Sequence, residues 1–291
     1  MFVHLGIALA FVAMLCWGFG DFFIQKSTRK VGDFESLFFI TAFGAVILLP
    51  FAYKNLPAVF SGSYNNLLIL GILCAVLFFA AILDFEALRV GKLSVVEPIW
   101  SFEVPVSALL AFFILGEKIG FAQILLIIFL LFGLALVSLR NKFQIRKLFW
   151  EKGALIAFFG AVMMGVANFY MGWGSRISDP VMANFISDLF IAIVCGVVLI
   201  ARGKFKQTIR DIFSNKAILL PMSIADKAAW LAFAFAMSLA PIAIVVALSE
   251  SYIIIAVILG LAINKEKLHS HQKFGLIVAV FSAIILASIT G

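Results

Sequence analysis

Acidic side chains in apolar surroundings are the residues of this chain that could do chemistry. Glu97, Trp100 and Glu103 follow one another at steps of three inside one apolar stretch, so on a helix they cover an arc of about 120°. A charge near the centre of a bilayer costs at least about 2.5–3.5 kcal/mol, so each one needs a reason to be there. Because an aromatic face attracts cations, the group predicts a site for a cationic or amine-bearing ligand, or for a proton. The structural alternative is an acid paired inside a helix bundle with Trp100 as packing.

Two prolines bracket this group. Pro98 and Pro105 lie on either side of Trp100. Pro105 has no N–H to donate to the carbonyl of Ser101, so that carbonyl is expected to be free for a ligand or water. The sequence therefore predicts a locally broken helix at the site.

Other apolar stretches carry polar residues of the same kind. Asn184 and Asp188 share a helix face at i,i+4, and so do Asp226 and Trp230. Lys227 is the only cation well inside a stretch, and we expect it to pair with an acid on a neighbouring helix. The candidate substrate-binding or proton-coupling residues are Trp17, Glu97, Trp100, Glu103, Asn184, Asp188, Asp226, Lys227, Trp230, Glu250 and Tyr252.

Three further acids lie near the ends of apolar stretches. We interpret Asp21, Asp84 and Glu86 as members of ion pairs or hydrogen bonds at the membrane interface. Glu86 has Arg89 one turn on, and Asp21 has Gln25 at i+4.

Ten long apolar stretches must position these residues. The chain of 291 residues is 64% hydrophobic and 13% charged, unlike a soluble globular protein. Each stretch is long enough to cross about 30 Å of hydrocarbon as a helix. Barrel strands would be shorter and would alternate. We predict spans at 3–24, 35–53, 67–88, 93–115, 121–139, 153–173, 180–201, 217–239, 242–263 and 274–289.

The stretches form two copies of five. Residues recur at an offset of 147, and later at 149: Gly6, Phe11, Gly18, Asp21, Phe22 and Arg29 as Gly153, Phe158, Gly165, Asn168, Phe169 and Arg176; Glu117, Lys118 and Gln123 as Glu266, Lys267 and Gln272. Since five is odd, the second copy crosses the membrane inverted, as in secondary transporters with a site between their halves. We predict an all-α polytopic fold with ten transmembrane helices in a 5+5 inverted repeat around a central cavity. Its parts are 1–139, a basic connector at 140–152, and 153–291.

The cations support the inversion. Eighteen Lys and Arg lie in the odd-numbered connections and three in the even-numbered ones. Cytoplasmic loops carry the excess of Lys and Arg, so both termini are predicted outside the cytoplasm. Every pair of equivalent connections differs in its cation count, as inverted copies should.

Several function classes find no support. The cysteines are single and the histidines lie in connections or near the N-terminus, so neither a disulfide framework nor a metal site is predicted. No P-loop, catalytic triad or Gly-rich phosphate cradle is present, so we expect neither an enzyme nor a cofactor. The net charge of +7 is spread over many loops, which does not predict a nucleic-acid partner.

The chain resembles the EamA-type branch of the drug/metabolite transporter superfamily over its whole length. The resemblance rests on the pair Trp17-Gly18, on "LGEKIG" at 115–120 and on the degenerate copy "NKEKLH" at 264–269. It implies a basket of spans one to four and six to nine around a cavity, with spans five and ten outside. It also implies transport of small metabolites, amino acids or drugs, commonly outward, and both termini in the cytoplasm, in conflict with the loop charges.

We therefore expect a secondary transporter, an exporter of a small metabolite, amino acid or organic cation by alternating access. Burial disfavours the charged form of a carboxylate, so the intramembrane acids could couple transport to protons. An uncoupled facilitator and a lipid or lipid-linked sugar translocator are the alternatives. An acidic cavity lining favours cations and protons, and a basic one favours phosphates. The expected partners are the lipid bilayer, a small molecule and protons, in the cell membrane; the oligomeric state stays open.

Overall fold

The structure is a computed structural model that describes residues 2–91, 96, 99–138, 153–252, 254–255 and 269–290. Its helices are α1 (Phe2–Val31), α2 (Asp33–Ala52), α3 (Leu56–Phe60), α4 (Tyr64–Val90), α6 (Glu103–Leu115), α7 (Phe121–Ser138), α9 (Ala154–Ile177), α10 (Pro180–Ala201), α11 (Phe205–Ser214), α12 (Lys216–Leu239), α13 (Ile242–Ser249) and α15 (Ser270–Thr290). No strand occurs in these ranges, so the all-helical prediction is confirmed for them.

Eight of these helices are long and apolar enough to cross a membrane: α1, α2, α4, α7, α9, α10, α12 and α15. Each falls on one predicted span. The other two predicted spans, 93–115 and 242–263, lie partly outside the described residues, so the count of ten stays a prediction. The connector at 140–152 also lies outside them.

Both of these spans are interrupted at equivalent positions. A turn at residues 101–102 precedes α6, and a turn at 250–251 follows α13. The N–H of Phe102 donates to the carbonyl of Ile99 over 3.1 Å, and that of Ser251 donates to Leu248 over 3.2 Å. Both are i,i+3 bonds, which tighten a helix locally. The break predicted beside Pro105 is therefore present, and the second repeat has one as well.

The carbonyl of Ser101 is not free, contrary to expectation. The N–H of Val104 donates to it over 3.3 Å, because the tightened turn brings a closer donor. Nor does the break depend on proline, since the second repeat has Ile254 where the first has Pro105. There, the hydroxyl of Ser251 donates to the carbonyl of Ala247 over 3.2 Å, and such side-chain bonds compete with the helical pattern.

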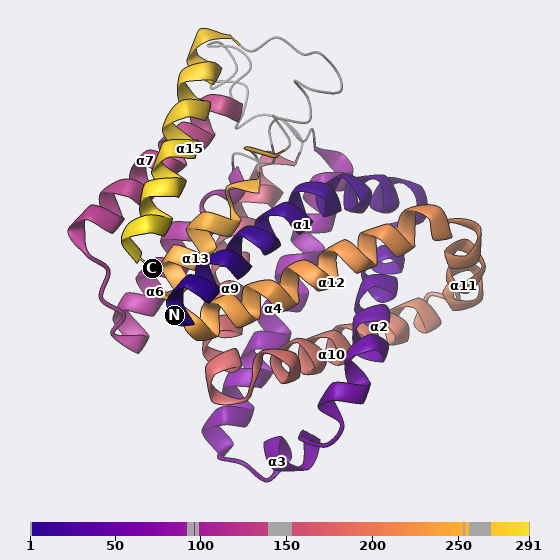
Figure 1. The fold of residues 1–291 in the computed structure, drawn as a ribbon. Helices are drawn as coiled ribbons and strands as arrows, with labels where there is room; N and C mark the ends of the chain where they lie inside the picture. The colour runs from indigo at the N-terminus through magenta and orange to yellow at the C-terminus, as the bar shows by residue number, and fades with distance from the viewer. Residues whose placement is uncertain are drawn as a thin grey trace.

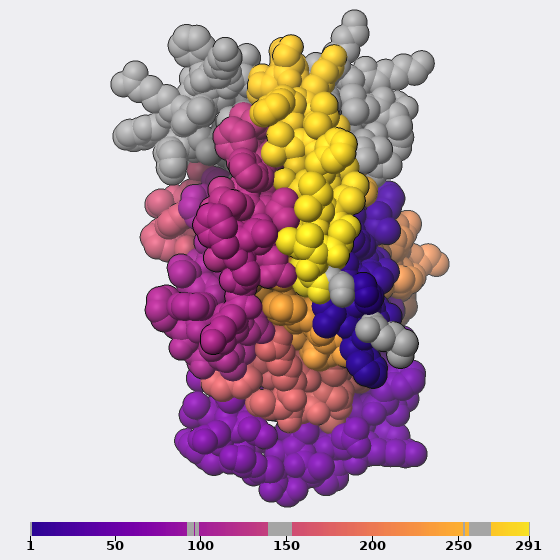
Figure 2. Space-filling model, turned by 60° about the vertical axis from the view of Figure 1, so that its left-hand side comes forward, coloured from indigo at the N-terminus to yellow at the C-terminus, as the bar shows by residue number. Residues whose placement is uncertain are grey.

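Helix packing is unchanged when the two repeats are exchanged. The most extensive contacts join α1 with α12, α4 with α9, α2 with α10, and α7 with α15. When each helix is replaced by its counterpart in the other repeat, the pair α1 with α12 becomes α9 with α4. The pairs α2 with α10 and α7 with α15 are unchanged. Figures 1 and 2 show α7 and α15 side by side on one flank of the molecule, beside the other helices. That arrangement agrees with the family resemblance, which places spans five and ten outside the basket.

Two glycines paired by sequence allow the same close approach in each repeat. A methyl group added at Gly18 would lie 3.2 Å from the Cβ of Ile255, and one at Gly165 would lie 2.7 Å from the Cβ of Val106. Ile255 and Val106 are themselves equivalent at the offset of 149. Gly18 therefore lets α1 approach the interrupted span of the second repeat at Ile255, after α13. Gly165 lets α9 approach the interrupted span of the first repeat at Val106, within α6.

Two glutamines at equivalent positions of the repeats each accept a hydrogen bond from a backbone N–H at the start of a helix. The side-chain oxygen of Gln123 accepts the N–H of Gly120 over 2.8 Å, and that of Gln272 accepts the N–H of His269 over 3.0 Å. Both satisfy a donor at the start of a helix, where no intrahelical acceptor is available. The start of α1 and the end of α15 lie near one another, and α11 lies on the far side of the molecule (Figure 1).

Candidate functional site

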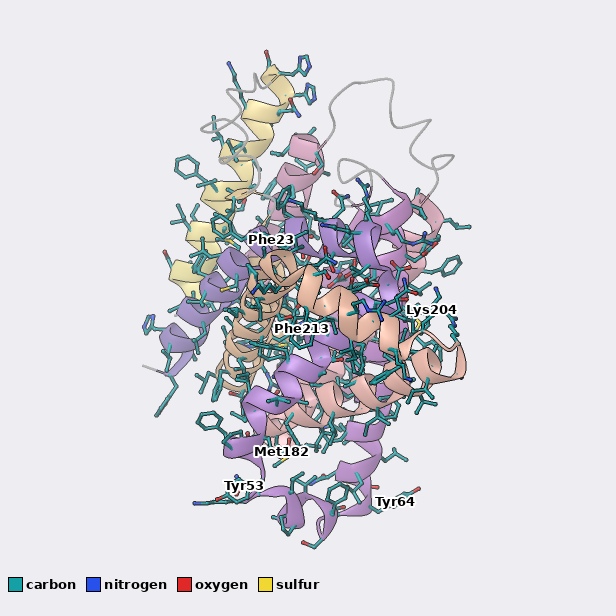
Figure 3. The ribbon with its side chains drawn as sticks, turned by 90° about the vertical axis from the view of Figure 1, so that its right-hand side faces the viewer. Phe23, Tyr53, Tyr64, Met182, Lys204 and Phe213 are labelled. Carbon is teal, nitrogen blue, oxygen red and sulfur yellow. The ribbon has the colours of Figure 1, made fainter. Side chains whose placement is uncertain are left out.

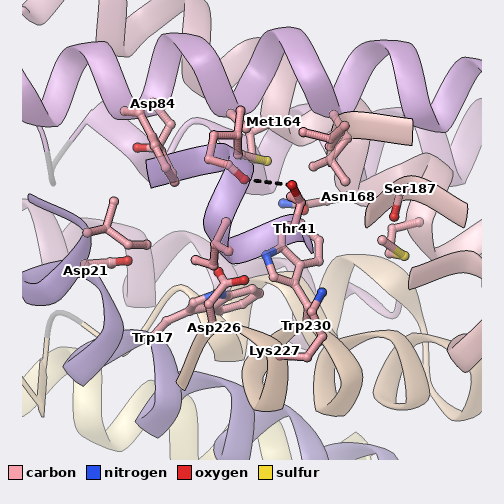
Figure 4. Close-up of a pocket in the computed structure, with 18 of the residues that line it drawn as sticks. Trp17, Asp21, Thr41, Asp84, Met164, Asn168, Ser187, Asp226, Lys227 and Trp230 are labelled. Atoms are coloured by element: carbon pink, nitrogen blue, oxygen red, sulfur yellow. Dashed lines mark hydrogen bonds between the residues drawn. The ribbon is translucent and has the colours of Figure 1, made fainter. Parts of the chain in front are cut away.

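One pocket brings together ten of the eleven candidate residues. It lies among α1, α2, α4, α6, α9, α10 and α12, at the interface of the repeats (Figure 4). The candidates that line it are Trp17, Trp100, Glu103, Asn184, Asp188, Asp226, Lys227, Trp230, Glu250 and Tyr252. The eleventh, Glu97, lies outside the described residues. Sequence reasoning thus found residues that converge in space, although it did not establish what they bind.

Lys227 has the acidic partner that the sequence predicted. Its ammonium on α12 forms an ion pair with the carboxylate of Asp188 on α10, and the two side chains are 6% and 9% exposed. Gly44 on α2 lies directly against both groups, and even a methyl group there would collide with them. Because the α2 backbone approaches the ion pair this closely, only glycine fits at position 44.

A second buried contact holds Glu103. The side-chain amide of Asn168 on α9 donates to its carboxylate over 2.8 Å, drawn as the dashed line in Figure 4. The acids whose charges act on Glu103 are Glu250, Asp84 and Asp21. We call these three with Glu103 the four-acid group. Asn168 was not among the candidates, although the repeat signalled it as the counterpart of Asp21.

Asp21 and Asp84, which the sequence assigned to ion pairs or hydrogen bonds at the membrane interface and not to the site, line the pocket together with the candidates. The helices that carry them extend past the predicted spans, α1 to Val31 and α4 to Val90. Neither residue therefore sits at a helix end. Glu86 forms the predicted ion pair with Arg89.

The charge balance of the pocket is strongly acidic. Among the described residues, its lining includes one ammonium, that of Lys227, and six carboxylates, those of Asp21, Asp84, Glu103, Asp188, Asp226 and Glu250. The ammonium is paired with Asp188. Like charges held together in a medium of low dielectric disfavour one another, so the site can hold a cation or protons.

Aromatic rings form part of the wall. Trp17 and Trp230 pack edge to face with 5.4 Å between ring centroids. Trp100 and Tyr252 also line the pocket. Rings beside carboxylates suit a positively charged organic group, since the ring face attracts it electrostatically.

The lining comes from equivalent positions in the two repeats. At the offset of 147 the pairs are Asp21 with Asn168 and Thr41 with Asp188; at 149 they are Leu77 with Asp226, Ala81 with Trp230, and Glu103 with Tyr252. The pocket therefore straddles the boundary between the repeats, where substrate sites of inverted-repeat transporters lie. In the described ranges, no group of three His, Cys, Asp or Glu is arranged to hold a metal ion.

Comparison with protein families and solved structures assigns the chain to a family. No curated protein is significantly similar to it. A solved structure titled only "Crystal structure of protein" is similar over 98% of both chains, with a TM-score of 0.73 and 14% identity, which shows a shared fold alone. A model of the EamA-like transporter family matches twice, over residues 4–139 and 151–288. With its multiple apolar helices, this integral, multi-pass membrane protein therefore belongs to the EamA-like transporter family.

Proposed function

We propose that the protein is a secondary transporter that moves a small cationic or amine-bearing metabolite by alternating access and exchanges it for protons. One observation carries the proposal: in the part of the chain that the structure describes, six carboxylates and one ammonium line one pocket between the repeats. This excess of negative charge needs a counter-charge, which a substrate cation or bound protons would supply.

The four-acid group is the proposed position of the substrate's positive charge. The carboxylate of Asp188 is already compensated by Lys227, whereas Glu103 shares the pocket with three further acids whose charges act on it. The side-chain amide of Asn168 holds Glu103 in place, so the carboxylate is positioned before a ligand arrives. Trp17, Trp100 and Tyr252 would then contact the apolar part of the substrate.

Proton coupling follows from the same crowding. When the substrate cation leaves, the acids around Glu103 are again close together in low dielectric, and protons can replace the lost charge. Exchange of one cation for protons would keep the pocket near neutrality in both orientations. We propose that substrate moves outward across the cell membrane.

The lipid-linked sugar alternative is less well supported. A phosphate-bearing ligand needs basic or N–H groups around it, and the one ammonium among the described lining residues, that of Lys227, is engaged by Asp188. An uncoupled facilitator of the same substrates would use the same pocket and is the outcome that the experiment must separate.

Purified protein in liposomes with an internal pH-sensitive dye provides the test. A diamine, a quaternary ammonium ion, a zwitterionic amino acid and a sugar phosphate would be added in turn. We expect one or more of the positively charged compounds to drive proton movement through the wild type. Glu103→Gln and Glu250→Gln should abolish it without impairing folding, while Asp211→Asn on α11, outside the pocket, should leave it intact.

Two results would contradict the proposal. Substrate flux that is equal and pH-independent in wild type and both variants would establish the uncoupled facilitator. A response to the sugar phosphate alone would favour the phosphate-bearing ligand instead.

Direction requires knowledge of orientation, which the loop charges predict. With 18 cations in odd connections and three in even ones, the termini should lie outside the cytoplasm. A C-terminal alkaline phosphatase fusion should then be active and a C-terminal green fluorescent fusion dark. The reverse pattern would assign the termini to the cytoplasm, as the family resemblance implies.

A further inference from the structure

The short helix α11 has an apolar face that the protein covers only in part. Phe205 packs edge to face on Phe38 with 5.6 Å between centroids, Ile212 packs against the core, and Thr208 is buried. Ile209 and Phe213 lie beside them on the helix but are 36% and 73% exposed. The exposed part of this face needs another apolar partner.

Two cations border the exposed apolar strip. At about 100° per residue, Lys206 and Arg210 follow Ile209 and Phe213 around the helix, and the polar residues come next. Both cations are exposed. In the described part of the chain, neither takes part in an ion pair, whereas the adjacent Lys204 lies 3.9 Å from a carboxylate oxygen of Glu35.

The two helices that flank α11 also expose apolar side chains. Ile200 in the last turn of α10 and Leu220 in the first two turns of α12 are 61% and 41% exposed. Both belong to helices that can cross a membrane, and α11 connects them. Since α11 joins the end of one such helix to the start of the next, Ile209 and Phe213 are expected at the depth where a span ends and headgroups begin.

We propose that α11 binds an anionic phospholipid, with its phosphate headgroup between Lys206 and Arg210 and its acyl chain against Ile209 and Phe213. The order around the helix is that of interfacial helices, in which apolar side chains enter the acyl region and cations meet the headgroups. Basic residues beside a span attract anionic lipid in this way. The site is independent of the pocket and of its proposed substrate.

The equivalent segment in the other repeat lacks the cations. α3 occupies the same place between the second and third spans of the first repeat, and it contains no cation. Tyr53 and Tyr64 flank it at one end of the molecule, well away from Lys204 and Phe213 of the α11 segment (Figure 3). The nearest cation in its connection is Lys54, which therefore offers a matched control.

The test measures lipid retention and thermal stability of the purified full-length protein. Native mass spectrometry would compare adducts of phosphatidylglycerol and phosphatidylcholine on wild type, Lys206→Gln/Arg210→Gln and Lys54→Gln. We expect wild type and Lys54→Gln to retain phosphatidylglycerol selectively, and the double variant to lose at least fivefold of that adduct. The melting temperature should rise with phosphatidylglycerol in the first two proteins only.

Two outcomes would overturn the proposal. One is undiminished selective retention of phosphatidylglycerol in the double variant. The other is an equal rise in melting temperature with inorganic phosphate alone, which would indicate a free anion rather than a lipid. If the double variant does not fold, Phe213→Ser replaces it, and unchanged retention in that variant would contradict the acyl contact.

Discussion

Arg29 and Arg176 occupy equivalent places in the two repeats and bind equivalent groups. The guanidinium of Arg29 at the end of α1 donates to the carbonyl of Gly91 over 2.9 Å, and that of Arg176 at the end of α9 donates to Ala240 over 3.0 Å. Each satisfies a carbonyl where the third span of its repeat ends and intrahelical donors are lacking. The scaffold role of this position is therefore the same in both halves.

Of these two arginines, only Arg176 forms an ion pair with the other repeat in the described part of the chain. Arg176 also forms an ion pair with Glu117 of the first repeat, 2.6 Å between Nη1 and Oε1. The other oxygen of Glu117 accepts the N–H of Ile242 over 3.0 Å. Glu266, the counterpart of Glu117, lies outside the described residues. Glu117 thus ties the two repeats together at the Arg176 end.

The pocket also differs between its two ends: it extends further toward the Arg29 end than toward the Arg176 end. Phe85 and Leu88, near the Arg29 end of α4, line it. Their counterparts at the offset of 149, Ala234 and Met237, are fully buried and are not part of its lining. The symmetric scaffold thus holds a pocket that reaches further toward one end. In alternating access the two ends are expected to exchange these roles.

The largest effect is expected at the ion pair, which has no counterpart in the first repeat. Phe78 and Thr41 occupy the positions equivalent to Lys227 and Asp188. Lys227→Met should cost about 3–5 kcal/mol of folding stability, because it leaves the carboxylate of Asp188 buried without its partner. Lys227→Met with Asp188→Leu should recover most of the loss. Thermal unfolding in detergent would measure both, with the exposed Lys216→Met as the control.

A single variant as unstable as the double one would contradict this interpretation. It would mean that packing volume at Lys227, rather than charge, sustains the second repeat. Equal stability of Lys227→Met and wild type would show that the carboxylate finds another partner.

A smaller effect is expected from closing the gap that accommodates this pair. Gly44→Ala would push a methyl group against Asp188 and Lys227, and overpacking of this kind costs about 1–3 kcal/mol. Gly71→Ala is the matched control, because nothing lies within 4 Å of a Cβ there. The same unfolding assay should show a loss for the first variant and little change for the second. Equal behaviour of the two would mean that α2 shifts without strain.

The sequence predicts the scaffold well because apolar length and internal repetition are visible in it. The pairs at offsets of 147 and 149 make equivalent contacts, and polar residues inside apolar stretches stand out by their cost. Ten candidates therefore meet in one pocket. The sequence does not reveal where each helix ends: α1 and α4 continue past the predicted spans, and Asp21 and Asp84 were therefore not singled out as pocket residues. Nor could it reveal Gly44, whose role depends on a three-dimensional approach.

The next effect is expected at Arg176. Arg176→Gln should lower the free energy of unfolding by about 1–2 kcal/mol. A hydrogen bond to a charged group contributes about 1.5–3 kcal/mol, and we expect a value at the low end because the Arg176 side chain is 28% exposed. Glu117→Gln should share the part that comes from the ion pair. If the pair holds the Arg176 end shut, a cysteine at Met237 should react faster with a soluble maleimide in the Glu117→Gln background. Unchanged reactivity would reduce Glu117 to a structural role.

The smallest effect is expected from making the first repeat resemble the second within the pocket. Asp21→Asn gives position 21 the residue found at its counterpart, Asn168. It removes one of the acids around Glu103 but leaves the contact between Asn168 and Glu103 in place. A partly solvated charge contributes about 1 kcal/mol or less, so apparent affinity for a cationic substrate should fall less than tenfold. Liposome flux at graded substrate concentrations would measure it, beside Glu103→Gln. A complete loss of transport would make Asp21, rather than Glu103, the acid on which the site depends, and would shift the proposed substrate position toward α1.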